Sequence, residues 1–186
     1  MPGDLAEWHV IAPRDEPALP DAHQAFRDAC RAPLDTSPLR EAVEPHEHVV
    51  IVTSDGTRPL PNHLLIPWLL EELPVPPEQV TVLIGTGSHR GNTPDELEAM
   101  FGADVLRKVR VVNHDAFAPI EAVARSPWSD AQAGSPSHGN EHVGTTEGGI
   151  SVALNTAYVR ADKRIAVGFI EPHFFAGFSG GPKAVA

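Results

Sequence analysis

The stretch that decides the fold of this 186-residue chain is His48-Val49-Val50-Ile51-Val52-Thr53-Ser54-Asp55-Gly56-Thr57-Arg58-Pro59. Its first half, from His48 to Val52, is a continuous run rich in β-branched residues, which is typical of a strand buried on both faces of a sheet. Polar residues follow at once. The same order occurs where the apolar run Val80 to Ile84 is followed by Gly85-Thr86-Gly87-Ser88-His89-Arg90-Gly91-Asn92. We therefore expect parallel strands whose end loops carry polar side chains.

Helices are predicted between the strands, from apolar residues at helical spacing and from residues that cap helix ends. The predicted helices are 22–31 after Asp21, a short one after Ser37, 62–73 capped by Asn62, and 94–101 after the capping box Thr93-Pro94-Asp95-Glu96. The further predicted strands are 109–112, short extended pieces near Val143 and at 150–152, and 163–170, with a helical turn after Asn155. This alternation favours an α/β fold with a mostly parallel, Rossmann-like sheet and flanking helices.

The beginning of the chain and one internal segment differ in composition from the rest. Several prolines interrupt regular structure between a short predicted strand, 8–11, and the helix that follows it. We expect residues 1–36 to form an N-terminal extension and residues 37–186 to form an α/β domain. The segment 126–141 is rich in Ser, Gly and Pro, so we expect a mobile surface loop and assign it no function.

Charge and composition exclude several classes of protein. The chain has 14 Lys and Arg against 25 Asp and Glu, a net charge of −11, which argues against nucleic acid and anionic membrane surfaces as partners. A single cysteine, Cys30, allows neither an internal disulfide nor a paired-cysteine metal site. The sequence also lacks an apolar run of the ~20 residues that a membrane helix needs, and its first residues lack the basic start and apolar core typical of a signal peptide, so none is expected. A cytoplasmic protein is expected.

Reactive side chains are concentrated in loops that follow predicted strands. These side chains are Asp55 with Arg58, His89 with Arg90, and His173 with Lys183. In an open parallel sheet, the loops at the carboxyl ends of the strands form the crevice in which ligands bind. Residues far apart in sequence are therefore expected to meet at a single site.

Arg58 and His89 are the first two candidates for this site. The planar guanidinium of Arg58 suits a substrate carboxylate, and Asp55 is close enough in sequence to orient either the arginine or a histidine. A surface ion pair is the alternative. His89 lies among glycines and small hydroxyl residues, where the backbone can approach a ligand closely. The alternative is a histidine without a function.

Two more histidines follow predicted strands. His173 lies between Pro172 and Phe174, and this apolar setting favours the neutral imidazole that a general base needs. A core histidine with satisfied ring nitrogens is the alternative. His114, in Asn113-His114-Asp115, either supports the site from behind or braces its loop through a hydrogen bond.

The turn Ser179-Gly180-Gly181-Pro182-Lys183 presents consecutive backbone N–H groups that can hold a phosphate, with Pro182 expected to start a helix. Its spacing differs from the nucleotide-triphosphate loop, because Ala184 stands where Ser or Thr is required. ATP hydrolysis is therefore disfavoured. The remaining histidines lack partners at the spacing of metal ligands, which argues against a zinc site.

Four motifs together resemble the nickel-dependent lactate racemase family. They are Ser54-Asp55-Gly56-Thr57-Arg58-Pro59, Gly85-Thr86-Gly87-Ser88-His89-Arg90, Asn113-His114-Asp115 and the segment Gly168 to Lys183. All four occur in the order of that family, and the resemblance extends from about Ser37 to the C-terminus. It includes the turn Gly144-Thr145-Thr146-Glu147-Gly148-Gly149.

The resemblance implies a cofactor, the nickel-pincer nucleotide, a pyridinium mononucleotide with two sulfur-containing arms that hold nickel. The lysine that binds this cofactor covalently in the family matches Lys183, and its paired catalytic histidines match His89 and His173. The arginine that binds the substrate carboxylate matches Arg58, with Asp55 as support. The implied reaction is racemisation or epimerisation of a 2-hydroxy acid by reversible hydride transfer. Proteins that synthesise the cofactor are implied partners.

The resemblance also implies that part of the active site lies elsewhere. The nickel-ligating histidine of the family would follow Ala186, so no nickel ligand is expected within this chain. We expect the N-terminal domain of a two-domain protein that is inactive by itself. One other function stays open, a non-catalytic module that binds a phosphorylated or carboxylated metabolite through Arg58 and Gly180-Gly181. A hydrolase that uses His89 and His173 with a metal is disfavoured, because the carboxylate and cysteine ligands that would support the metal are lacking.

Overall fold

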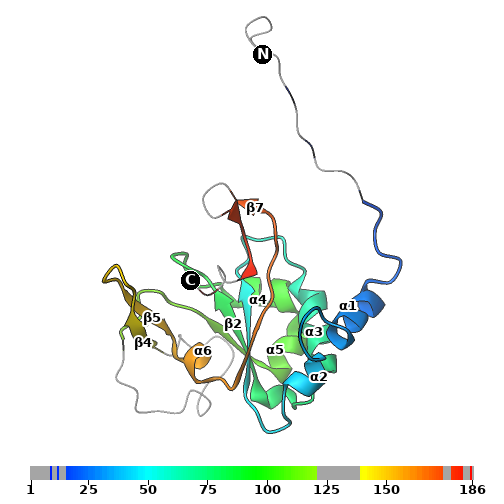
Figure 1. The fold of residues 1–186 in the computed structure, drawn as a ribbon, viewed down its shortest axis with the longest axis horizontal. Helices are drawn as coiled ribbons and strands as arrows, with labels where there is room; N and C mark the ends of the chain where they lie inside the picture. The colour runs from blue at the N-terminus through cyan, green and yellow to red at the C-terminus, as the bar shows by residue number, and fades with distance from the viewer. Residues whose placement is uncertain are drawn as a thin grey trace, which may run out of the picture.

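A computed structural model describes residues 9, 12, 16–120, 139–173, 177–181 and 185. The helices are α1 (Ala22–Arg31), α2 (Leu39–Ala42), α3 (Asn62–Glu72), the 3-10 turn η1 (Pro77–Gln79), α4 (Pro94–Phe101), α5 (Ala103–Lys108) and α6 (Thr156–Arg160). The strands are β1 (Val49–Ser54), β2 (Val80–Gly85), β3 (Arg110–Asn113), β4 (Asn140–Thr145), β5 (Ser151–Asn155), β6 (Lys163–Ala166), β7 (Pro172–His173) and β8 (Gly177–Phe178). Figure 1 shows their arrangement.

Four parallel strands form the central sheet, in the order β3-β2-β1-β6. Val49 of β1 is paired with Val80 of β2 on one side and with Lys163 of β6 on the other. The chain adds β2 and β3 on one side of β1 and then crosses to place β6 on the opposite side. Such a reversal of strand order opens a crevice at the carboxyl ends of the strands. The predicted α/β fold with a parallel sheet is confirmed.

One face of the sheet packs on helices. Alternate strand residues such as Ile51 and Val82 are fully buried there against Ile66 of α3 and Phe101 of α4. The helices α3, α4 and α5 cover this face, and α1 packs on α3 (Figure 1). Glu72 at the end of α3 is 3% exposed and lies within ion-pair distance of three arginines of α1 and α2. This face holds the larger part of the core.

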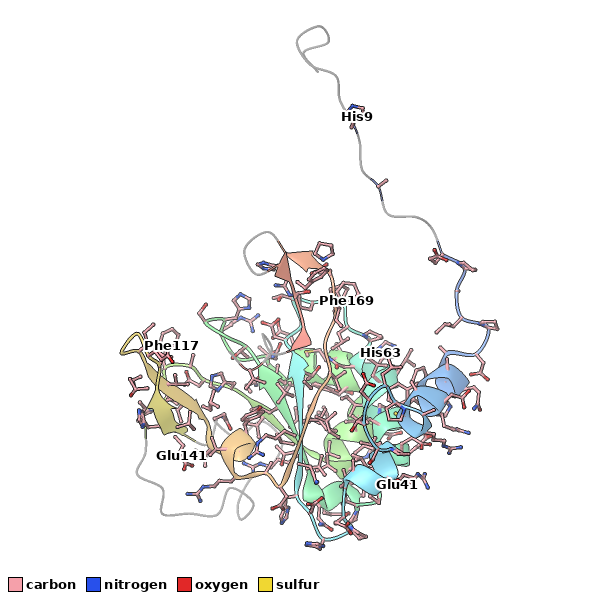
Figure 2. The ribbon with its side chains drawn as sticks, in the orientation of Figure 1. His9, Glu41, His63, Phe117, Glu141 and Phe169 are labelled. Atoms are coloured by element: carbon pink, nitrogen blue, oxygen red, sulfur yellow. The ribbon has the colours of Figure 1, made fainter. Side chains whose placement is uncertain are left out.

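Fewer elements pack on the other face of the central sheet. Val50, Val52 and Leu83 form a smaller cluster there with Ala161 and the half-buried Tyr158. The antiparallel hairpin of β4 and β5 leads into α6 beside this cluster. Figure 2 shows Phe117 next to this hairpin, on the opposite side of the molecule from α1 and α3.

Two predicted helix starts agree with the structure. The Asp21 side chain accepts a hydrogen bond from the backbone N–H of Gln24, and Thr93 and Glu96 form the predicted capping box. The prediction for Asn62 was wrong. Pro61 occupies the capping position, and the buried Asn62 side chain instead accepts a hydrogen bond of 2.7 Å from Thr53 of β1. The Asn62 side chain therefore bonds to the preceding strand and not to the backbone of its own helix.

Several predicted boundaries also needed correction. The last strand of the sheet, β6, ends at Ala166 rather than at residue 170, and a short helix, α5, was not predicted. Part of the predicted loop 126–141 is strand, because β4 begins at Asn140. The predicted strand 8–11, residues 121–138 and the helix expected from Pro182 lie outside the described residues, apart from His9. In the part of the chain that is described, no helix has the length and hydrophobicity to cross a membrane.

Candidate active site

Asp55 follows β1 directly, and its side chain is held from two sides. One carboxylate oxygen, Oδ1, accepts hydrogen bonds from the backbone N–H and the hydroxyl of Thr57, at 3.1 and 2.6 Å. The other oxygen, Oδ2, lies 2.6 Å from Nδ1 of His89. Burial by itself would raise the pKa of Asp55, but the hydrogen bonds from Thr57 and His89 outweigh it and hold the pKa below its usual value. Asp55 is therefore a carboxylate at neutral pH.

His89 receives its orientation from this carboxylate. Because a carboxylate only accepts hydrogen bonds, Nδ1 of His89 must carry the proton, and in the neutral imidazole Nε2 is left as an acceptor. The loop is fixed from behind, since the backbone N–H of His89 donates to the carbonyl of Thr86. The histidine side chain is 58% exposed, against 8% for that of Asp55. The buried Asp55 carboxylate thus holds His89 so that its basic Nε2 is available to a ligand.

Arg58 lies in the same turn as Asp55. Its backbone N–H donates to the carbonyl of Asp55, and its side chain is exposed. Within the described part of the chain, the guanidinium of Arg58 has no carboxylate within ion-pair distance, so the surface ion pair considered as an alternative is not present there. The sequence left open whether Asp55 orients an arginine or a histidine, and in the structure its partner is His89.

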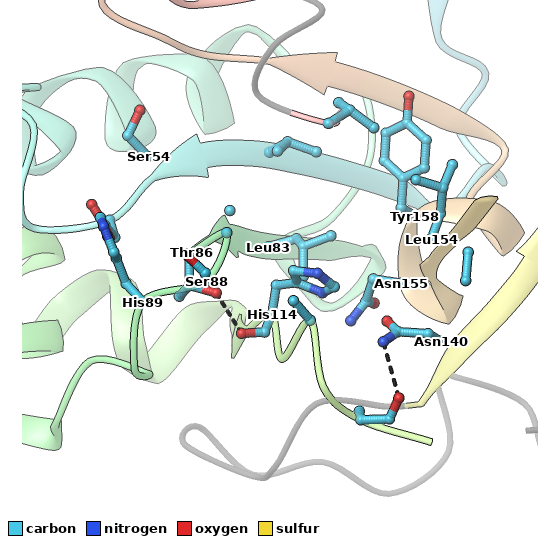
Figure 3. Close-up of a pocket in the computed structure, with 18 of the residues that line it drawn as sticks. Ser54, Leu83, Thr86, Ser88, His89, His114, Asn140, Leu154, Asn155 and Tyr158 are labelled. Atoms are coloured by element: carbon cyan, nitrogen blue, oxygen red, sulfur yellow. Dashed lines mark hydrogen bonds and ion pairs between the residues drawn. The ribbon is translucent and has the colours of Figure 1, made fainter. Parts of the chain in front are cut away.

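These side chains line a cleft with a volume of about 790 Å³ at the carboxyl ends of the strands. The loops after β1, β2 and β3 contribute Asp55, Arg58, His89 and His114, as the sequence led us to expect from their positions. Ser179 and Gly180, which follow β8, complete the wall. Figure 3 shows Ser54 and His89 at one end of the cleft and His114, Asn140, Asn155 and Tyr158 at the other.

Gly180 is required by the local geometry. Its φ is +75°, and a Cβ atom at this position would lie 3.0 Å from the carbonyl oxygen of Phe169. Gly181 also has a positive φ, +57°, and is exposed. The buried hydroxyl of Ser179 donates to the same Phe169 carbonyl at 2.8 Å, which closes the turn. Backbone, with no side chain in the way, therefore faces the cleft here.

The structure does not bring every predicted residue into the cleft. His173 is half-buried in the β7–β8 hairpin, beyond the end of the sheet where β6 ends (Figure 1), and is not part of the described cleft wall. Lys183 lies outside the described residues. Among the residues that are described, no group of three His, Cys, Asp or Glu is arranged to hold a metal ion.

Three residues of the cleft were missed from sequence. Asn140, Asn155 and Tyr158 come from the β4–β5 hairpin and α6, which no motif connected with the strand-end loops. The helical turn predicted after Asn155 was a signal for Asn155 only, and the pairing of Asn140 with Asn155 in the hairpin is visible only in the structure. His114 was considered a supporting residue, and its ring is part of the cleft wall.

The fold and the cleft define an α/β domain with a carboxylate-oriented histidine at the strand ends and a guanidinium that no carboxylate of the described residues pairs. The family model described as the lactate racemase N-terminal domain matches residues 3–126 and 130–186. The chain belongs to this family. It is 38% identical over 159 residues to a lactate racemase of Thermoanaerobacterium thermosaccharolyticum, and 34% identical over 155 residues to one of Lactiplantibacillus plantarum.

A solved structure agrees with this assignment. The lactate racemase apoprotein from Thermoanaerobacterium thermosaccharolyticum matches with a TM-score of 0.70 and 34% identity, covering 88% of this chain and 35% of that one. The two relatives are covered over 84% and 82% of this chain, but over 33% and 32% of their own lengths. This chain thus spans about a third of the proteins that it matches.

Proposed function

We propose that the protein to which this domain belongs is a racemase or epimerase that acts on a lactate-like 2-hydroxy acid. The observation that carries the proposal is the Asp55–His89 pair, with the Arg58 side chain in the same cleft. Arg58 binds the substrate carboxylate, and Nε2 of His89 takes the proton of the substrate hydroxyl. Asp55 stabilises the imidazolium that results. The names of the relatives support the same substrate class.

Inversion at the carbon that bears the hydroxyl requires a bond of that carbon to break, because proton transfer from the hydroxyl by itself leaves the stereocentre intact. We propose that the hydrogen on that carbon leaves as a hydride, which needs an acceptor. We propose the nickel-pincer nucleotide for this role, held by Lys183 with Gly180 and Gly181 around it. When bound, this cofactor would supply a reversible acceptor for the hydride. The flat 2-keto acid formed between loss and return of the hydride can be reduced on either face, and the proton returns from a histidine.

The residues present fit a group of this size. The cleft, at about 790 Å³, is within the range of about 300–1,000 Å³ that is usual for sites of cofactors and drug-sized ligands. The turn at Gly180 presents backbone to the cleft. We assign His173 to the second base, which serves the enantiomer whose hydroxyl points away from His89. The nickel ligand is expected outside this chain, in the cytoplasmic holoenzyme that the cofactor-synthesising proteins load.

Denaturing mass spectrometry tests the cofactor assignment. The whole protein, produced together with the cofactor-making enzymes, should carry a nucleotide-sized adduct on the peptide that contains Lys183. Lys183→Ala should abolish both the adduct and racemisation, whereas Lys108→Ala, at the exposed end of α5, should leave both unchanged. An active enzyme with an unmodified Lys183 would refute the proposed cofactor and favour the metabolite-binding module.

Histidine variants test the proton transfer separately. His89→Ala should remove racemisation while nickel and substrate still bind, because His89 is proposed as a base and not as a metal ligand. The exposed His63 of α3, which lies far from the hairpin side of the cleft (Figure 2), supplies the matched control His63→Ala. Loss of nickel from the His89→Ala protein would contradict this role.

A further inference from the structure

The end of the cleft opposite His89 contains a buried acceptor without a partner. Asn140 is 4% exposed, and its amide nitrogen donates to the backbone carbonyls of Asp115 and Ala118, at 3.0 and 3.2 Å. These two bonds fix which way the amide points, because only the NH₂ side can donate to carbonyls. The remaining atom, Oδ1, is buried without a hydrogen-bond partner among the described residues. Figure 3 shows Asn140 in the cleft, with its bond to the backbone as a dashed line.

His114 adds a second unsatisfied atom to the same end. The backbone of His114 is occupied, since its N–H donates to Ile84 and its carbonyl accepts the hydroxyl of Thr86 at 2.6 Å. The ring nitrogen Nδ1 is buried and has no partner in the described part of the chain. Burial lowers the pKa of His114, although the nearby charge of Asp115 partly opposes this. The ring is therefore neutral at pH 7 and offers one donor and one acceptor.

The chemistry of this end selects against an anion. An unpartnered carboxamide oxygen repels a phosphate or a carboxylate, whereas a hydroxyl group can donate to it. Among the described residues of the cleft wall, Arg58 is the only Lys or Arg, and it follows β1 beside Asp55. The phenol of Tyr158 is a further hydroxyl in the same wall (Figure 3). Buried polar atoms are normally hydrogen-bonded, so two such atoms in one wall point to a missing ligand group.

We propose that Asn140 and His114 form a subsite that binds the sugar hydroxyls of a mononucleotide. A vicinal diol both donates and accepts, as this pair of side chains requires. The proposal rests on the function proposed above, and it adds the orientation of the ligand. The sugar lies at the Asn140 end of the cleft, and the reacting groups lie at the His89 end.

Binding measurements with a simple pyridinium mononucleotide test the subsite. Nicotinic acid mononucleotide and its 2′,3′-dideoxy analogue would be titrated into the protein and into its His114→Phe variant. We expect the parent protein to prefer the hydroxylated ligand about tenfold, and the variant to lose most of that preference. Phe removes both ring nitrogens at similar volume, while the backbone bonds of His114 stay. His63→Phe is the control and should keep the preference.

The stability of the variant separates a ligand-binding role from a structural one. Removing a buried polar atom that has no internal partner should leave the thermal transition of the ligand-free protein unchanged or raise it. A structural histidine would instead lower it. Imidazole ¹⁵N resonances provide a second measurement that needs no variant. The ring of His114 should respond to the mononucleotide and much less to the dideoxy analogue.

Three results would overturn the subsite. They are an unchanged preference in His114→Phe, no binding of either mononucleotide, and a response of the His114 ring to inorganic phosphate that matches its response to the mononucleotide. Failure of the proposed function is recognised independently, because an active enzyme would then carry an unmodified Lys183, regardless of which mononucleotide the cleft prefers.

Discussion

The two faces of the central sheet differ in how much of the molecule covers them. On the helical face, Ile51 and Val82 are buried beneath α3 and α4 in the larger apolar cluster. On the opposite face, Val52 and Leu83 belong to a smaller cluster that α6 covers, and both of these residues also line the cleft. Parallel sheets are normally covered by other elements on both faces. The unequal cover of this sheet therefore gives its two faces different roles. The helical face stabilises the fold, and the thinly covered face leaves room for a ligand.

Three large apolar side chains are exposed on the hairpin side of the molecule. Phe117 is 81% exposed, Ile150 68% and Ile120 58%. They belong to the hairpin of β4 and β5 or to the segment between β3 and β4. The helical side also exposes apolar residues, with Leu34 after α1 at 92% and Leu64 of α3 at 41%. The two faces differ instead in what is buried, and because the larger apolar cluster lies under the helices, stability is expected to respond much more to changes on the helical face.

A pair of leucines gives the largest and most direct test of this difference. Leu97 of α4 is 3% exposed on the helical face, and Leu83 of β2 is 4% exposed on the cleft face. Leu97→Ala should lower the free energy of unfolding by about 4 kcal/mol, and Leu83→Ala by about 2 kcal/mol, because the cleft lets water or neighbouring groups fill the space. Denaturant unfolding measures both. Equal losses would contradict the proposed division between the faces.

The buried carboxylate of Glu72 provides the second test. Arg31 donates two hydrogen bonds to it, at 3.2 and 3.1 Å, with Arg27 and Arg40 nearby. Removing its charge with Glu72→Gln should cost about 2–3 kcal/mol, somewhat less than for a fully buried pair because the arginines are partly exposed. Glu71→Gln, on the exposed side of the same turn, should change stability by less than about 0.5 kcal/mol.

The pH dependence of this effect follows from the pKa of Glu72. The hydrogen bonds from Arg31, opposed by burial and aided by the three arginine charges, hold that pKa below its usual value of 4.5. A carboxyl whose pKa is lower in the folded state stabilises the protein above its unfolded pKa, and this contribution is lost as the pH falls through the folded value. The acid limb of the stability curve should therefore flatten in Glu72→Gln. An unchanged acid limb would show that the cluster does not contribute.

The smallest effect on stability is expected at the cleft itself. Asp55→Asn removes a charged acceptor from Thr57 and His89 and should cost about 1 kcal/mol. The larger consequence is the tautomer of His89, because an amide does not require a proton on Nδ1. Imidazole ¹⁵N spectra should show Nδ1–H in the parent protein and a mixture of tautomers in the variant. Asp104→Asn on α5 is the control, and a tautomer unaffected by Asp55→Asn would refute the orienting role.

Sequence patterns were sufficient to predict an element wherever the residues that cause it lie within that element or at its ends. The β-branched runs gave β1 and β2 within one or two residues, and the Thr93 capping box and Gly102 gave the start and the end of α4. The same patterns placed Asp55 and His89 directly after strands. Because parallel strands end at the same edge of a sheet, a shared cleft could be inferred before any coordinates. The family resemblance added roles for these residues, and those roles remain proposals.

Sequence patterns alone predicted the class of fold and the end of the sheet at which Asp55, Arg58 and His89 lie. The tertiary structure decided which groups meet: Asp55 pairs with His89 across 34 positions of the sequence, Asn62 bonds to a strand instead of capping its helix, and Asn140 forms part of the cleft wall. Local patterns act over one or two turns of chain, whereas these contacts depend on strand order and packing. The partner of a side chain on another helix or strand is therefore known only once the sheet has been assembled.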